Sequence, residues 1–432
     1  MNTKTNTQIR LILMNFLEFA VWGAYLTSQG RYLASIGLGP QIGWFFSIQG
    51  IVSIFMPALM GIIADKWIPA QKLLGICHLV AGAFMIMAGF YGIRSGSYAE
   101  FGPLFTLYAL SIAFFMPTIA LTNSVSYNAL EKVGLDTVKA FPPIRVFGTI
   151  GFIISMWVVD LMGYMDSPVQ YGISGALSLV LGAYAFTLPA CPVNKSSEKK
   201  SLVDAMGLRA FTLFKESRMA IFFIFSMLLG VALQITNSFA NPFMGDFRHI
   251  PEFAETFGVK HSGMLISLSQ ISETLCILLI PFCLKKFGIK KVMLISMFAW
   301  VLRFAFFGLG DPGSGVWLFV LSMIVYGVAF DFFNISGSLF VDQNTDAAMR
   351  SSAQGLFMLM TNGLGAAVGT LGAQAIVNHF VNSHSPKADI LARMAGWDTC
   401  WYIFAAYALV IAIVFAIIFK YKHTPEATAK AE

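Results

Sequence analysis

The sequence predicts an all-α membrane protein with twelve transmembrane helices in two six-helix bundles, and three observations predict this fold class. First, 57% of the 432 residues are hydrophobic, only 12% are charged, and the mean hydropathy is +0.72. Soluble domains contain about 25% charged residues, so the composition excludes an ordinary soluble fold. Second, twelve apolar runs approach the length of about 20 residues that crosses a bilayer as a helix. Third, a long polar connection separates these runs into six and six.

The expected spans follow one another along the chain with mostly short connections. They cover residues 11–33, 42–63, 73–93, 103–128, 143–164, 170–190, 219–242, 262–284, 292–309, 316–341, 353–379 and 399–419. The first run follows Lys4 and Arg10, as a secretion signal would. Because the run is long and contains Glu18, we interpret it as an uncleaved helix.

The longest connection, residues 191–218, is polar and basic. We interpret it as a cytoplasmic linker between an N-terminal bundle, residues 1–190, and a C-terminal bundle, residues 219–432. A weak internal repeat agrees with this division, because YALSIAFFM at residues 108–116 aligns without gaps to YGVAFDFFN at residues 326–334.

Basic residues predict the orientation, since Lys and Arg are retained on the cytoplasmic side of a membrane. Twenty of the 28 lie in the N-terminus, alternate loops and the C-terminus, six lie on the opposite side, and Arg145 and Arg303 lie within spans. Both termini are therefore predicted to be cytoplasmic. This asymmetry explains the net charge of +6, so no nucleic-acid partner is needed. The five cysteines lack metal-ligand spacing, and we expect neither a metal nor another cofactor.

Asp331 lies in the middle of the tenth apolar run. A charge at the centre of a membrane helix costs roughly 2.5 to 3.5 kcal/mol on insertion scales, and such a residue commonly marks a route for an ion, proton or substrate. It therefore indicates a transporter. Five other charged residues fall within spans: Glu18, Arg145, Asp160, Glu273 and Arg303. For Asp160 and Arg303, which lie nearer span ends or can pair, a structural role is favoured.

Polar residues recur at helical spacing in both halves of the chain. Residues three or four apart lie on one helix face, as do Gln234 with Asn237, Gln270 with Glu273, Asp331 with Asn334, and Arg145 with Thr149 and Phe152. Amides, carboxylates, an arginine and a phenylalanine together suit a small neutral ligand with a planar part and several hydroxyl groups. A nucleoside is such a ligand. The alternative is that the amides only join helices, at roughly 0.6 to 2 kcal/mol each.

Asp331 and Glu273 also indicate proton coupling. Burial and neighbouring charges change the proton affinity of a carboxyl group. A site that opens alternately to the two sides of the membrane can therefore load and release a proton.

Several strings resemble one family, the bacterial nucleoside:proton symporters of the major facilitator superfamily. They are FPPIRVFGTIGF, MAIFFIFSMLLG, SQISET and FDFFNISG, which begin at residues 141, 219, 269 and 330. The resemblance runs from the first span to Phe419–His423. In addition, GIIADK at residues 61–66 partly resembles the loop signature of the superfamily between the second and third spans.

The resemblance implies a transporter that takes up nucleosides across the bacterial inner membrane by alternating access, driven by protons. Nothing in the sequence demands more than a monomer, so we expect a monomer. Its substrate would lie at the midplane between the two halves. The implied substrate residues, with Asn334 added from the stripe, are Arg145, Thr149, Phe152, Gln234, Asn237, Gln270, Glu273, Phe330 and Asn334. Asp331 is the leading candidate for proton coupling. Glu18 replaces a glutamine expected in the family, and we expect it either to share proton coupling as a second titrating group or to alter selectivity.

Two other functions remain to be weighed. A proton symporter for another polar solute, such as a sugar, would use the same scaffold. A membrane enzyme such as a prenyl transferase would need clustered carboxylates for magnesium and phosphate, and no Asp-Asp or Asp-x-x-x-Asp group lies in a span. We therefore expect no enzymatic activity. A receptor is not favoured either, because the sequence shows no signalling domain.

Overall fold

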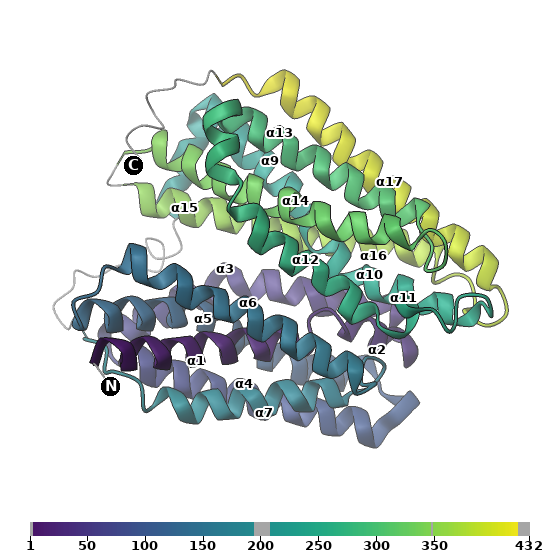
Figure 1. The fold of residues 1–432 in the computed structure, drawn as a ribbon, viewed down its shortest axis with the longest axis horizontal. Coiled ribbons are helices and arrows are strands. Elements are labelled where there is room, and N and C mark those ends of the chain that lie inside the picture. The colour runs from purple at the N-terminus through teal and green to yellow at the C-terminus, as the bar shows by residue number, and fades with distance from the viewer. Residues whose placement is uncertain (1–2, 194–207, 347–348, 422–432) are drawn as a thin grey trace. The chain divides into compact units, whose positions relative to one another are not determined.

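The structure, a computed structural model, describes residues 3–193, 208–346 and 349–421, and throughout these residues the regular elements are helices (Figure 1). The chain forms two compact units, Met1–Ala205 and Met206–Glu432. The division falls within the expected linker 191–218. Residues 194–207 of that linker lie outside the described part, so the limits of the linker and of the two bundles stay predictions.

The first unit consists of seven α-helices and two short 3-10 turns. The α-helices are α1 (Thr3–Gly23), α2 (Gln29–Ser35), α3 (Ile42–Lys66), α4 (Ala70–Ser95), α5 (Phe101–Lys132), α6 (Thr137–Leu161) and α7 (Val169–Ala185). The turns are η1 (Gly39–Gln41) and η2 (Gly96–Tyr98). Helix α1 packs against α6, whereas α4 packs against both α5 and α7. These contacts place α1 among α5, α6 and α7.

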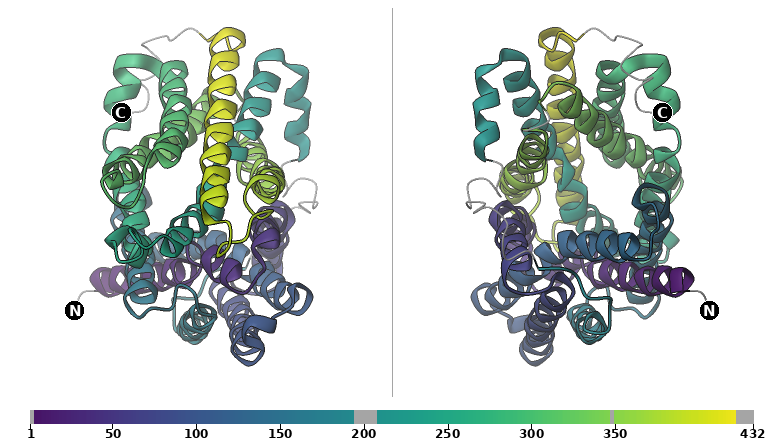
Figure 2. Two further views of the ribbon diagram at one scale, coloured as in Figure 1. Left: turned by 90° about the vertical axis from the view of Figure 1, so that its right-hand side faces the viewer. Right: turned by 90° about the vertical axis from the view of Figure 1, so that its left-hand side faces the viewer.

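The second unit is built around α13, α14 and α17. Its elements are η3 (Leu208–Lys215), α9 (Ser217–Leu233), α10 (Ile235–Asp246), η4 (Phe247–His249), α11 (Phe257–Lys260), α12 (Ser262–Ile277), α13 (Ile280–Leu309), α14 (Val316–Gln343), α15 (Arg350–Met358), the π-helical η5 (Leu359–Gly365), α16 (Ala366–Phe380) and α17 (Ile390–Ile418). Helix α13 packs against α14 and against α17, the long yellow helix of Figure 2. Helix α12 packs on α14, and α9 packs on η5 and α16.

Nine helical segments in the described part of the chain are long and apolar enough to cross a membrane. The three expected spans not among them fall on α1, α7 and α12. Helices α7 and α12 have 17 and 16 residues, which at 1.5 Å per residue is about 25 Å, slightly less than the bilayer core. Helix α1 has 21 residues but includes a polar N-terminal turn.

Two span boundaries differ from the sequence-based expectation. The first span was expected to be one helix over residues 11–33, and this is wrong, because α1 ends at Gly23 and the chain turns before α2 begins at Gln29. Conversely, α13 joins two expected spans. Its Gly288 has φ of 74°, in the left-handed region that favours glycine. Gly288 therefore lies in the expected connection between the eighth and ninth spans and breaks the helix there.

Glycines allow close helix contacts inside the second unit. A Cβ atom on Gly365 would lie 2.4 Å from the carbonyl oxygen of Met227, and one on Gly369 would lie 2.4 Å from Cα of Val231. Small residues at such positions are typical of packed membrane helices. Gly372, in contrast, has open space where its Cβ would be. The backbones of η5 and α16 therefore touch α9 at two defined points.

Candidate functional site

Asp331 and Glu273 form an acidic pair in the second unit. Asp331 lies in the middle of α14, 5% exposed, and interacts electrostatically with Glu273 of α12. Both carboxyl groups also interact with the Tyr326 hydroxyl. Within the described residues, Oδ2 of Asp331 is buried and makes no hydrogen bond. A buried polar atom without a partner is uncommon. Here it is a carboxyl oxygen next to a second carboxyl group, an arrangement that suits the binding of a proton.

Arg303 supports an aromatic pair beside these acids. It is 2% exposed, and its guanidinium carbon lies 4.4 Å from the ring centroid of Tyr326. Its Nη1 donates to the carbonyl oxygen of Ser322 at 2.7 Å, and its Nη2 donates to Oγ1 of Thr236 at 3.2 Å. Tyr326 in turn stacks on Phe330, with centroids 5.6 Å apart and planes 11° apart. Arg303 and Tyr326 therefore position Phe330, a role for Tyr326 that the sequence analysis missed.

Three of the predicted amides lie between α9 and α10, on α10 and on α12. Gln234 interrupts the helix between α9 and α10, so the expected continuous helical face is broken there. Gln234 nevertheless meets Asn237, whose Nδ2 donates to its Oε1 at 3.0 Å. On α12, the buried Oε1 of Gln270 accepts no hydrogen bond in the described part of the chain. These side chains present donors and acceptors suited to the edge of a heterocyclic base.

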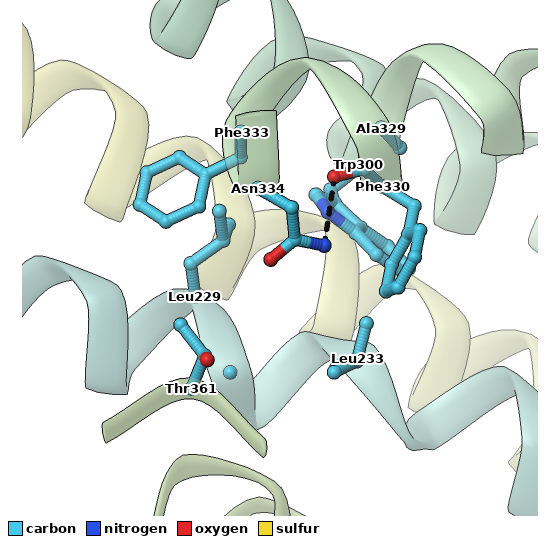
Figure 3. A pocket seen from close by; sticks show the side chains of 9 residues that line it. Leu229, Leu233, Trp300, Ala329, Phe330, Phe333, Asn334 and Thr361 are labelled. Atoms are coloured by element: carbon cyan, nitrogen blue, oxygen red, sulfur yellow. Dashed lines mark hydrogen bonds between the residues drawn. The ribbon is translucent and has the colours of Figure 1, made fainter. Parts of the chain in front are cut away.

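A small pocket lies within the second unit. It is lined by Leu229, Gly230, Leu233, Trp300, Ala329, Phe330, Phe333, Asn334 and Thr361 (Figure 3). Two predicted substrate residues, Phe330 and Asn334, are in this lining. The side chain of Asn334 extends between Leu229 and Phe330, and its Nδ2 donates to the Phe330 carbonyl oxygen at 3.1 Å. Apolar walls around a few polar groups are typical of ligand pockets.

The other predicted residues of the second unit do not line this pocket. They are Gln234, Asn237, Gln270, Glu273 and Asp331. They belong to the same unit, and Asp331 is adjacent in sequence to Phe330 of the pocket lining on α14. The tryptophan ring of Trp300, at the pocket wall, also contacts Tyr326 edge to face at 6.0 Å. Sequence analysis missed Trp300 because nothing distinguishes it from a packing residue.

The predicted stripe of the first unit lies on α6 where it packs on α1. The guanidinium carbon of Arg145 lies 3.7 Å from the ring centroid of Phe19, a close cation–π contact. Phe152 is buried and meets Trp22 edge to face, with centroids 6.3 Å apart. Thr149 is half-buried between them along the helix. The stripe therefore combines a cation, a hydroxyl group and an aromatic ring beside α1.

Glu18 lies deep inside the first unit, 1% exposed. Its Oε2 lies 2.7 Å from Nε2 of His78 on α4, and both of its oxygens contact threonine hydroxyls of α5. The sequence analysis missed His78, although a histidine within the third span was a visible signal. Within the described residues, no group of three or more His, Cys, Asp and Glu side chains is placed to hold a metal ion.

Comparisons with known proteins agree on one family. Residues 5–424 match the family described as Nucleoside H+ symporter. The chain is 49% identical to the xanthosine permease and 46% identical to the nucleoside permease NupG of Escherichia coli (strain K12), in each case over 97% of both chains. A crystal structure of the nucleoside transporter NupG matches with a TM-score of 0.87 and 46% identity, covering 98% of this chain and 100% of that chain.

More distant structures show the fold alone. A bacterial homologue of the lysosomal transporter Spinster matches with a TM-score of 0.68 at 13% identity, covering 100% of this chain and 98% of that chain. The helical fold is thus shared well beyond the sequences that are closely similar.

Proposed function

The chain belongs to the nucleoside H+ symporter family, and on that premise we propose how its residues perform proton-coupled nucleoside uptake. The protein is a membrane transporter with the major facilitator fold, not an enzyme. The observation that carries the proposal is the buried Asp331 carboxyl group, with one oxygen unpartnered beside Glu273. The proposal divides the work between this aspartate, which binds the proton, and its neighbours, which bind the nucleoside.

In the second unit, the nucleoside base is proposed to lie on Phe330, supported from behind by the stacked Tyr326 ring. Gln234, Asn237, Gln270 and Asn334 supply the hydrogen-bonding groups for the base and sugar edges, and Glu273 accepts from ribose hydroxyls. The unpartnered Oε1 of Gln270 supports this assignment, because a ligand donor would satisfy it.

In the first unit, Arg145, Thr149 and Phe152 are proposed to complete the substrate contacts. Their shared face on α6 supports this role. The Arg145 guanidinium is held over Phe19, so its direction is fixed by packing before any ligand arrives. Such preorganisation lowers the entropy lost on binding.

Proton binding at Asp331 is proposed to be linked to nucleoside binding through Glu273. Two carboxylates that interact in a low-dielectric interior repel one another, so protonating Asp331 removes the repulsion that a charged Glu273 would feel. Glu273 can then accept hydrogen bonds from the ribose as a carboxylate. Proton binding and substrate binding therefore favour one another, as linkage requires.

The proposal extends to the cellular setting. We place the protein in the bacterial inner membrane with both termini in the cytoplasm, because basic residues dominate that side of the sequence. We propose that it works as a monomer with no cofactor other than the transported proton. Similarity to a xanthosine permease and to a nucleoside permease supports nucleosides as the substrate class.

A substrate panel in proteoliposomes tests this function. Xanthosine, uridine, adenosine, free bases and sugars are offered with an imposed pH gradient, inside alkaline. We expect nucleosides to accumulate and to lose accumulation when a protonophore collapses the gradient. Uptake that sugars inhibit and nucleosides leave unchanged would instead support a sugar symporter.

A further inference from the structure

A closed hydrogen-bonded cluster surrounds Glu18 in the first unit. Glu18 of α1 meets His78 of α4, with Oε2 to Nε2 at 2.7 Å, and it contacts Oγ1 of Thr118 at 2.6 Å and Oγ1 of Thr122 at 3.0 Å, both on α5. On α7, Oγ of Ser178 lies 2.9 Å from Nδ1 of His78. All five side chains are buried, with exposed fractions of 2% or less.

Counting hydrogens limits where the protons of this cluster lie. The Ser178 hydroxyl has one hydrogen and two acceptors at 2.9 Å, the carbonyl oxygen and Nδ1 of His78. When this hydrogen goes to the carbonyl oxygen, Nδ1 of His78 donates to Ser178. The contact between Nε2 and Oε2 of Glu18 also needs a hydrogen, because two lone pairs at 2.7 Å would repel. The Glu18 and His78 pair thus holds at least one proton between these two atoms.

The same count reveals a place for a second proton. Thr118 Oγ1 lies 2.5 Å from the carbonyl oxygen of Phe115 and 2.6 Å from Oε1 of Glu18, yet its hydroxyl has only one hydrogen. When Thr118 donates to Phe115, a hydrogen on Oε1 of Glu18 completes the second contact. With two protons on the Glu18 and His78 pair, every hydrogen bond of the cluster has its own hydrogen. With one proton, the Thr118 hydrogen is shared between the Phe115 carbonyl oxygen and Oε1 of Glu18.

The side chains named below that surround Glu18 and His78 are a thiol and hydroxyl groups. From α4, the buried Cys77 thiol interacts electrostatically with Glu18. Helices α5 and α7 contribute the hydroxyls of Thr118, Thr122 and Ser178. Helix α6 packs on another side of α1 and places Arg145 over Phe19, the residue next to Glu18. Phe19, which contacts the predicted substrate residue Arg145, is therefore the neighbour of Glu18 in sequence.

We propose that Glu18 and His78 form a second proton-binding site of this symporter, which always holds one proton and takes up another on the Glu18 carboxyl group in each transport cycle. The proposal rests on the proposed proton-coupled function, to which it adds His78 and a higher proton-to-nucleoside ratio. The two-proton state leaves an imidazolium ring that donates from both nitrogens, to Glu18 and to Ser178, so its added charge stays hydrogen-bonded.

The first experiment measures the proton-to-nucleoside ratio from the reversal potential in proteoliposomes, for the wild type and Glu18→Gln. We expect the ratio to fall by one in the variant, while proton-driven uptake persists. An equal ratio in both proteins would overturn the inference and leave the proposed function intact. If the wild type itself shows no proton-coupled uptake, the proposed function fails.

A second experiment uses two matched variants that keep the side-chain shape, Thr118→Val and Thr122→Val. In the two-proton state Thr118 accepts from the protonated carboxyl group, so the loss of this hydrogen bond should move the pH midpoint of uptake down. Thr122 donates to the carboxylate, so its loss should move the midpoint up.

The opposite signs separate proton binding from simple packing. If the hydroxyls only held helices together, both variants would lower the transport rate without moving the midpoint, or would move it in the same direction, and either result would refute the proposal. Calorimetry of nucleoside binding shows whether Glu18→Gln is folded. If it is not, Thr118→Val and Thr122→Val still test whether Glu18 binds a second proton.

Discussion

Gly230 of α9 offers a direct test of the pocket in the second unit. Both Gly230 and Thr361 line this pocket, and a Cβ atom on Gly230 would lie 2.3 Å from the Thr361 carbonyl oxygen. That distance is far inside van der Waals contact, and the obstructing atom belongs to the backbone. Gly230→Ala must therefore move η5 away from α9 and change the shape of the pocket.

The structure sets the size of the effect. Overpacking of this kind costs typically about 1 to 3 kcal/mol. If the strain falls on the nucleoside-bound form, this range corresponds to roughly a 5- to 150-fold loss of affinity. Part of the strain will also fall on the ligand-free protein and lower its thermal unfolding temperature.

Calorimetry of nucleoside binding and thermal unfolding of the purified protein measure both effects. Gly372→Ala in α16 is the matched control, because no atom lies within 4 Å of its added Cβ. The control should bind normally and be as stable as the wild type or slightly more so, since Ala favours a helix over Gly. Unchanged affinity and stability of Gly230→Ala would refute the reasoning.

Three further predictions concern single side chains. Glu273→Gln should weaken nucleoside binding by about tenfold or more in calorimetry, because a charged acceptor for the ribose is lost, and unchanged affinity would exclude that role. Phe330→Leu should weaken nucleoside binding by about 2- to 12-fold, which corresponds to the free energy of one aromatic stacking contact. If the variant lost affinity for a free sugar by the same factor, that result would argue against stacking of the base on Phe330. Arg393→Met should cost about 3 to 5 kcal/mol of stability, because it removes the charged partner of the buried Asp246 carboxylate at 2.6 Å; Thr399→Val, at a half-buried position, is the control for this thermal unfolding measurement.

The membrane helices were the most predictable part of the fold. A spanning helix satisfies its own backbone hydrogen bonds, so an apolar run of sufficient length is nearly enough to specify it. The breaks were less predictable. Gln234 and residues 24–28 interrupt helices where the sequence remains largely apolar, because packing against neighbouring helices decides those conformations. Gly288 was different, since basic residues around it already indicated a connection.

The candidate site divides in the same way. Helical spacing identified the polar residues of α6, α12 and α14, because residues three or four apart share a face. Contacts between distant parts of the chain were beyond this reasoning. Glu18 and His78 are 60 positions apart, and Arg303 of α13 contacts Tyr326 on the neighbouring helix α14. Whether the predicted residues bind the nucleoside and the proton stays a prediction.

The most direct test of the central claim is accumulation by Asp331→Asn in proteoliposomes under a membrane potential of about 100 mV. One proton moving through that potential releases about 2.3 kcal/mol, enough to concentrate a neutral nucleoside roughly fifty-fold. We predict that the variant binds and exchanges nucleoside across the membrane but equilibrates it without accumulation. Proton-driven accumulation at the wild-type level would contradict the assignment of the coupling proton to Asp331.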